Sequence, residues 1–293
     1  MNLRRFFHAG RGDSPAKRLV IHLLLILACI VAVYPISRIV SISLRPGDRL
    51  LSTDLRIIPQ DATLESYRLV LFGDPVTQRA SNFLLWLWNS LVITVLTAII
   101  GVILSASAAY AFSRFKFPGR GPGLIFLLAT QMIPAGMLLL PLYLMLVRLQ
   151  LVNTYLGLII AYSVSAVPFS IWILKGYFDT IPIDLEEAAR IDGTSHLGAF
   201  YRIILPLSTP SLAIVFLFNF MSGWSEYLVA RVVLQKEAMY TWPLGLWTFA
   251  GQYTLAAGRF AAASILIAVP AMVLFLYSSK WLVSGLTLGG VKG

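Results

Sequence analysis

The chain has 293 residues, of which 58% are hydrophobic and only 12% are charged. A soluble domain carries about twice that share of charged residues, so this composition excludes soluble, disordered and collagen-like classes and indicates an integral membrane protein. The single cysteine, Cys29, excludes a disulfide scaffold. The net charge of +10 is typical of nucleic-acid binders, but the basic residues lie in the gaps between long apolar runs, so we expect no nucleic-acid partner.

Six stretches are long and apolar enough to span a membrane as helices, which takes about 20 residues each. The sequence therefore predicts an all-α membrane protein with six transmembrane helices. In chain order the expected spans are about Leu19–Val40, Trp88–Ser113, Leu124–Val147, Tyr155–Leu174, Pro210–Val229 and Phe260–Val283.

An even number of spans puts both termini on the same side of the membrane. Basic residues concentrate in the N-terminal tail Met1–Arg18, in the short gap after the second span and in the gap after the fourth. Because short cytoplasmic loops carry the excess of Lys and Arg, we expect both termini in the cytoplasm. The expected organisation is a cytoplasmic tail at 1–18, a permease domain at 19–284 and a Gly-rich cytoplasmic tail at 285–293.

Motifs that would carry chemistry are missing. No Gly-Lys pair occurs, so there is no phosphate-binding P-loop, and there is no G-x-S-x-G nucleophile elbow. The three histidines, His8, His22 and His196, are far apart in the sequence and make a poor metal set with one cysteine. We therefore expect no catalytic residue, no metal site and no bound cofactor, and any transport must be powered by a partner.

The gap between the fourth and fifth spans, about 175–207, predicts two short helices on the cytoplasmic surface. Asp184 can cap the first helix, with Glu187 completing a capping box, and Gly193 ends it. Ser195 can cap the second helix. The first helix would carry a small apolar face made of Leu185, Ala188 and Ala189.

Two interpretations of this loop are open from the residues alone. The helix pair could lie on the lipid surface, or it could dock in a groove of a cytoplasmic partner. An anionic lipid surface prefers Lys and Arg, whereas this helix is rich in acids, which favours a basic partner. The acids concerned are Asp184, Glu186, Glu187 and Asp192.

The loop also carries a recognisable spacing. Glu187-Ala188-Ala189 is followed after three residues by Gly193, after nine more by Ile203, and then by Leu205-Pro206. This pattern resembles the EAA loop of ABC importer permeases. The resemblance implies that the first helix is a coupling helix held in a cleft of an ATPase subunit. The residues implied in that contact are Glu187, Ala188, Ala189, Asp192 and Gly193.

Other segments resemble the smaller permease subunit of maltose/maltodextrin-type carbohydrate ABC importers: Ser43–Gly47, Trp88–Ser90, Ala109–Arg114, Phe117–Gly119, Lys175–Phe178 and Trp281–Gly293. This resemblance implies a bacterial inner-membrane protein that works with a second permease, an ATPase homodimer that binds ATP and Mg, and an extracytoplasmic sugar-binding protein. It also implies that the C-terminal tail reaches the ATPase interface, through Gly289, Gly290, Val291 and Lys292. An importer for another α-glucoside, such as trehalose or sucrose, is the alternative, and a stand-alone secondary carrier is the rival from another class.

Two further sets of residues are candidates, and each has two interpretations. Glu226, Asn219 and Ser222 lie in or near the fifth span, where they fit a gating or pathway role. The alternatives are an interfacial anchor for Glu226 and helix–helix hydrogen bonds for Asn219 and Ser222. Aromatic residues between the last two spans fit either a loop that enters the binding protein, as the resemblance implies, or an interfacial belt. These aromatic residues are Tyr240, Trp242, Trp247 and Tyr253. The resemblance places the sugar in the larger permease, so no direct sugar ligand is expected in this chain.

Overall fold

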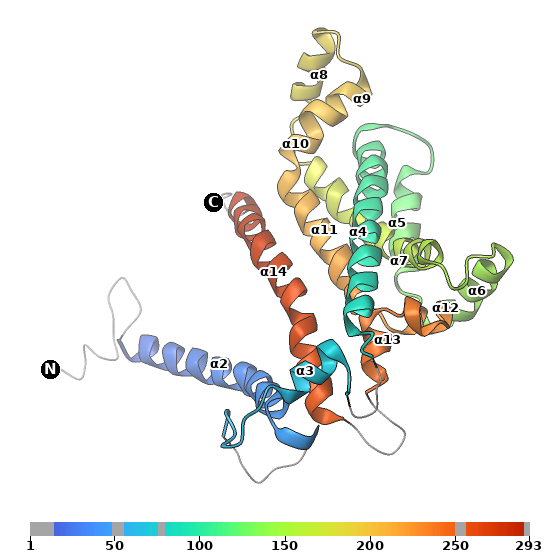
Figure 1. Cartoon of the computed structure of the whole chain (residues 1–293). Helices are drawn as coiled ribbons and strands as arrows, with labels where there is room; N and C mark the ends of the chain where they lie inside the picture. Colours follow the sequence, from blue (N-terminus) through green and yellow to red (C-terminus); the bar gives the residue numbers. More distant parts are fainter. Residues whose placement is uncertain (1–14, 49–55, 76–79, 250–255, 290–293) are drawn as a thin grey trace. The chain divides into compact units, whose positions relative to one another are not determined.

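The computed structural model describes residues 15–48, 56–75, 80–249 and 256–289, and these are helical over most of their length (Figure 1). The chain divides into two compact units. One comprises residues 1–80 and 249–266, and the other comprises 81–248 and 267–293.

Within the described residues, four helices are long and apolar enough to cross a membrane, and two bent helix pairs raise the number to as many as six. The four are Ala16–Ser43, Phe83–Arg114, Tyr155–Phe178 and Ala257–Trp281. The two bent pairs are α5 (Arg120–Thr130) with α6 (Ala135–Arg148), and His196–Leu207 with Thr209–Trp224. The predicted all-α membrane fold is confirmed.

The third predicted span is not one continuous helix. It breaks between α5 and α6, and the two halves differ in direction by 100°. Pro134 occupies the N-cap of α6 with an extended ψ of 129°. Proline disfavours the helical conformation in the residue before it, so the chain leaves the helix here and begins a new one at Ala135.

In the first unit, the end of α2 (Pro15–Ser43) meets η1 (Pro46–Asp48), α3 (Glu65–Phe72) and the start of α14 (Ala257–Gly289). The Asp48 carboxylate accepts hydrogen bonds from the Arg259 backbone N–H at 2.9 Å and from its Nε at 2.8 Å. The Ser43 and Tyr67 hydroxyls are 2.9 Å apart. The contacts of Asp48 with Arg259 join segments that are 211 residues apart in the chain, and the contact of Ser43 with Tyr67 joins segments that are 24 residues apart.

The core of the second unit is the packing of α4 (Phe83–Arg114) with α7 (Tyr155–Phe178) and α11 (Thr209–Trp224). The face of α4 that is buried in this packing consists largely of small and weakly polar residues, which lets helix backbones approach closely. It includes Ser90, Thr94, Thr97, Ala98, Gly101, Ser105, Ala106 and Ala109.

One end of α4 carries α8 (Asp184–Ile191) and α9 (His196–Ala199), which continue through a π-helical turn at Phe200–Ile204 into α10 (Leu205–Leu207) (Figure 1). The two predicted helices of the loop are thus present. Ser195 caps α9 as predicted, by accepting a hydrogen bond from the Gly198 N–H at 3.1 Å. The predicted capping box on α8 is wrong, because Ile183 is the N-cap and no side chain caps the helix.

The predicted stop at Gly193 is confirmed as a Schellman motif. Gly193 has a φ of +85°, in the left-handed region that glycine adopts without steric cost. Its N–H donates to the Arg190 carbonyl at 3.0 Å, and the Thr194 N–H donates to the Ala189 carbonyl at 2.9 Å.

The other end of α4 carries α12 (Leu228–Val233), η3 (Glu237–Met239) and α13 (Trp242–Trp247) (Figure 1). Asn89 fastens this loop to the start of α4. Its Nδ2 donates to the Ala238 and Tyr240 carbonyls at 2.9 and 3.0 Å, and its Oδ1 accepts from the Tyr155 hydroxyl at 2.7 Å. The amide therefore uses both its donor and its acceptor to hold three segments together.

Candidate functional site

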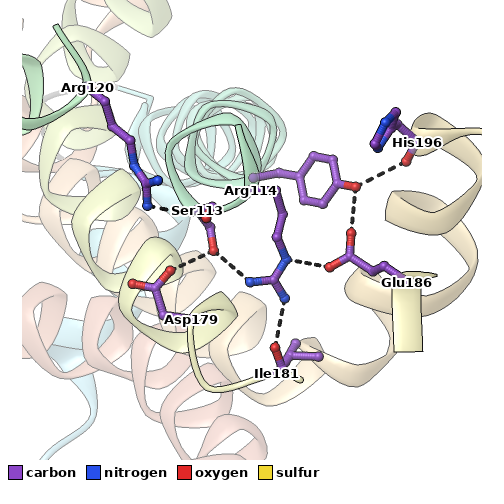
Figure 2. A network of polar contacts seen from close by, with 8 residues as sticks. Ser113, Arg114, Arg120, Asp179, Ile181, Glu186 and His196 are labelled. Carbon is purple, nitrogen blue, oxygen red and sulfur yellow. Dashed lines mark hydrogen bonds and ion pairs between the residues drawn. The ribbon is translucent and has the colours of Figure 1, made fainter. Parts of the chain in front are cut away.

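A polar cluster lies where α8 meets the last turn of α4. Glu186 is the one buried residue among the eight of α8, with 5% of its surface exposed. Its Oε2 accepts a hydrogen bond from the Tyr110 hydroxyl at 2.7 Å, and its Oε1 accepts one from Arg114 Nε (Figure 2). Tyr110 and Arg114 are four residues apart, so they share one face of α4 and grip one carboxylate together.

Arg114 makes two further contacts with the same guanidinium group. Its Nη2 donates to the Ile181 carbonyl at 2.9 Å, and its Nη1 donates to the Ser113 hydroxyl at 3.0 Å (Figure 2). In its ion pair with Glu186, the two side chains are only 8% and 7% exposed. A buried pair of this kind is costly to leave half-made, because the remaining charge would be desolvated and unpaired.

Asp179, the C-cap of α7, extends the cluster. Its carboxylate accepts hydrogen bonds from the Ser113 hydroxyl at 2.7 Å and from Lys175 Nζ at 2.5 Å. Burial alone would raise the pKa of Asp179, but the hydrogen bonds from Lys175 and Ser113 and the charges of Lys175 and Arg120 outweigh it and hold the pKa below its usual value. Asp179 is therefore ionised at neutral pH.

Aromatic contacts join the second loop helix to the same turn of α4. The Tyr110 ring lies 4.7 Å from that of Phe200 and 5.8 Å from that of Phe115, and the Phe115 ring lies 5.4 Å from that of His196. The Tyr110 hydroxyl is also 3.3 Å from the His196 carbonyl. Both loop helices thus rest on the end of α4.

The predicted coupling residues lie at the surface of the loop, in contrast to the buried Glu186. Glu187, Ala188, Asp192 and Gly193 are exposed, and Ala189 is partly exposed. The loop also exposes large apolar residues: Ile183, Leu185, Ile191, Leu197 and Tyr201. We call these ten residues the outer face of the loop.

The expectation that Glu186 faces a partner is wrong. Successive helical residues point about 100° apart, so when Glu187 faces outward Glu186 can turn toward α4. The sequence reasoning also missed Tyr110 and Arg114. A signal was present, since Arg114 directly ends an apolar span, but which of two neighbouring acids pairs with it depends on the helix rotation.

Glu226, Asn219 and Ser222 do not form one site. Glu226 caps α12, because its carboxylate accepts from the Val229 and Ala230 N–H groups at 2.9 and 3.1 Å. Asn219 is buried and its Oδ1 accepts from the Ser170 hydroxyl at 2.9 Å, which is a helix–helix hydrogen bond. Ser222 is exposed.

The predicted aromatic residues between α11 and α14 differ in exposure. Tyr240 packs against the hydrophobic core, and Trp242 is half-buried, with its backbone N–H donating to the Ser90 hydroxyl at 2.7 Å. Trp247 is exposed, with its ring 5.9 Å from that of Tyr227. Tyr253 and the tail residues Gly290, Val291 and Lys292 lie outside the described residues, and Gly289 is the last residue of α14.

Comparison with known proteins identifies the family. The model of the "Binding-protein-dependent transport system inner membrane component" family matches residues 99–286. The maltose/maltodextrin transport system permease protein MalG of Escherichia coli K12 is 38% identical over 294 residues, covering 96% of this chain and 98% of MalG. The galactooligosaccharides transport system permease protein GanQ of Bacillus subtilis is 36% identical over 273 residues, covering 93% and 94%.

A solved structure shows the same fold. It is that of a bacterial ABC transporter involved in the import of the acidic polysaccharide alginate, with a TM-score of 0.79, 24% identity and coverage of 93% of this chain and 98% of that chain. The fold, the apolar helices and the sequence relatives agree. The chain belongs to the binding-protein-dependent transport system inner membrane components, which are multi-pass, non-catalytic permeases.

Proposed function

We propose that this chain is one of two permease subunits of an ATP-driven importer for maltose or maltodextrins. It forms half of the translocation path and pairs with a MalF-like permease. The proposal is supported by the sequence relatives, which are named for maltose/maltodextrin and galactooligosaccharide transport. An extracytoplasmic binding protein delivers the sugar at the membrane face that carries α12 and α13, and Trp247 is the exposed candidate for contact with it.

The observation that carries the coupling role is the orientation of α8. Its one buried residue is an acid, while its large apolar residues face outward, with Ile191 88% exposed. A helix that served only the fold would bury those residues instead. The outer face also holds the acid Glu187, which suits a basic groove better than an anionic lipid surface. Its occupant is a cleft of a MalK-like ATPase subunit.

The α8 end of the bundle and both termini therefore lie in the cytoplasm. ATP and Mg bind to the ATPase dimer, whose closure moves α8. The helices then switch the path between inward-open and outward-open states as rigid bodies. The C-terminal residues Gly289, Gly290, Val291 and Lys292 contact the ATPase interface in this proposal.

Co-purification from the native host tests the assembly. The tagged chain, solubilised in mild detergent, should carry with it one second permease and two ATPase subunits. A chain that purifies alone in every detergent would contradict the proposal and favour a stand-alone carrier.

The substrate is tested with the binding protein and ATP in proteoliposomes. Maltose and maltotetraose should stimulate ATP hydrolysis, and trehalose, sucrose and galactooligosaccharides serve as the competing candidates. If one of those sugars and not maltose stimulates ATP hydrolysis, the chain belongs to an importer for that sugar instead.

A further inference from the structure

We infer that Arg114 is the positioning residue that makes α8 and α4 move as one body, by holding the buried Glu186 while the outer face stays exposed. The inference rests on the proposed function and deepens it. The partner binds α8 at the outer face, and the Arg114–Glu186 pair transmits the movement of α8 to the membrane-spanning helices.

The covalent backbone does not connect α8 directly to α4. α8 is joined covalently to α7 through the turn at Asp179–Ile183 and to α9 through Gly193. Arg114 is 72 residues away from Glu186 in the sequence. Any direct transmission from α8 to α4 must therefore pass through noncovalent contacts, and the polar cluster is where they are made.

The contacts are well suited to that task. Both oxygens of Glu186 are engaged by α4, one by Tyr110 and one by Arg114. Arg114 also holds the Ile181 carbonyl, in the turn that leads into α8. A planar guanidinium with several fixed donors restrains rotation as well as separation, which an ammonium group on a flexible stem does not.

The position of Arg114 connects it to the rest of the bundle. It lies in the last turn of α4, whose buried face packs along α7 and α11. A displacement of α8 therefore moves the end of α4, which is the helix at the centre of the packing. Glu186 and Glu187 have different roles, because α4 holds the carboxylate of Glu186 whereas Glu187 faces outward.

The first test measures how firmly α8 is held. Spin labels are attached at S107C on the exposed side of α4 and at R190C on exposed α8, in a C29S background, and the assembled complex is studied by pulsed electron resonance. Arg114→Gln and Glu186→Gln should each broaden the distance distribution, and the charge-swapped pair R114E/E186R should narrow it again. Arg259→Gln, which breaks the ion pair with Asp48 in the other unit, is the matched control and should leave it unchanged.

The second test measures coupling in proteoliposomes with the binding protein and radiolabelled maltose. The single variants should keep the ATPase bound, because the outer face is intact. Maltose moved per ATP hydrolysed should fall about tenfold, within the range typical of coupling between sites. The charge swap restores the ion pair but not the contacts with Tyr110 and the Ile181 carbonyl, so it should recover only part of the loss. Arg114→Lys keeps the charge and should lose less than Arg114→Gln.

The outcomes separate the inference from the proposed function. A narrow distance distribution in Arg114→Gln would overturn the inference, whatever the sugar. A broadened distribution with unchanged maltose moved per ATP would overturn it too. Failure of the unmutated complex to bind an ATPase or to move maltose would instead contradict the proposed function, and the same label distances measured in the purified chain would then decide whether Arg114 positions α8.

Discussion

The side-chain amide of Asn219 in α11 lies directly against Gly101 in α4. A β-carbon built at position 101 would come within 2.6 Å of Asn219 Nδ2, while Asn219 Oδ1 is held by the Ser170 hydroxyl of α7. One glycine thus lets three helices meet through a single buried amide.

Gly101→Val should destabilise the protein by about 1–3 kcal/mol, because the added methyl groups overpack a closed helix contact. Thermal unfolding in detergent would measure this. Gly136→Val is the matched control, since an added β-carbon there meets nothing within 4 Å. Equal losses at the two positions would show that helix propensity, and not the Asn219 contact, accounts for the effect.

Gly193→Val should weaken the end of α8, because only glycine adopts a φ of +85° without cost and the left-handed conformation costs other residues about 1–2 kcal/mol. Space is not limiting, since nothing lies within 4 Å of an added β-carbon. The ATPase should still co-purify in part, while maltose moved per ATP falls. Gly193→Asn should be tolerated better than Gly193→Val. Gly176→Val is a control on the exposed side of α7. Normal coupled transport in Gly193→Val would argue against the role of this turn.

Asn89→Ala should release the segment 237–241 from α4, because it removes two hydrogen bonds to carbonyl groups and one from the Tyr155 hydroxyl. Hydrogen exchange measured by mass spectrometry should be faster in that segment and unchanged in α8. Tyr155→Phe removes only one of the three bonds and should have the smaller effect. Identical exchange in Asn89→Ala and the unmutated protein would mean that other contacts are sufficient.

The low pKa of Asp179 predicts a pH dependence of stability. Because the folded-state pKa lies below the unfolded value, the carboxylate stabilises the fold above the unfolded pKa, and this contribution is lost as the pH falls through the folded pKa. The stability advantage over Asp179→Asn should therefore be constant near neutral pH and should shrink below about pH 4. Thermal unfolding at several pH values would measure it.

Ser113→Ala provides the matching variant for Asp179. It removes one hydrogen bond to the carboxylate, so the folded-state pKa should rise toward the unfolded value. The loss of stability should still begin near the unfolded pKa, but it should be smaller and should be complete at a higher pH. A loss of the same size in both proteins would assign the low pKa to Lys175 and Arg120.

Local features of the loop followed directly from residue types. Gly193 ends α8 and Ser195 caps α9 because each acts on its own backbone within a few residues. The capping box failed for the same kind of local reason, since Ile183 already occupies the N-cap and Asp184 lies inside the helix. The EAA spacing was equally readable, because it consists of positions close together in the chain.

The sequence by itself determined the class of protein, the apolar helices and the location of the two short helices that follow the fourth span, because hydropathy and helix signals act over one segment at a time. Only the tertiary structure decided that Glu186 turns toward Arg114 while Glu187 faces outward, that Tyr240 packs inside while Trp247 does not, and that α5 and α6 differ in direction by 100°. These outcomes depend on the rotation of each helix against neighbours far away in the chain. Periodicity shows that a helix exists, but the packing of its neighbours chooses which of two adjacent residues is buried.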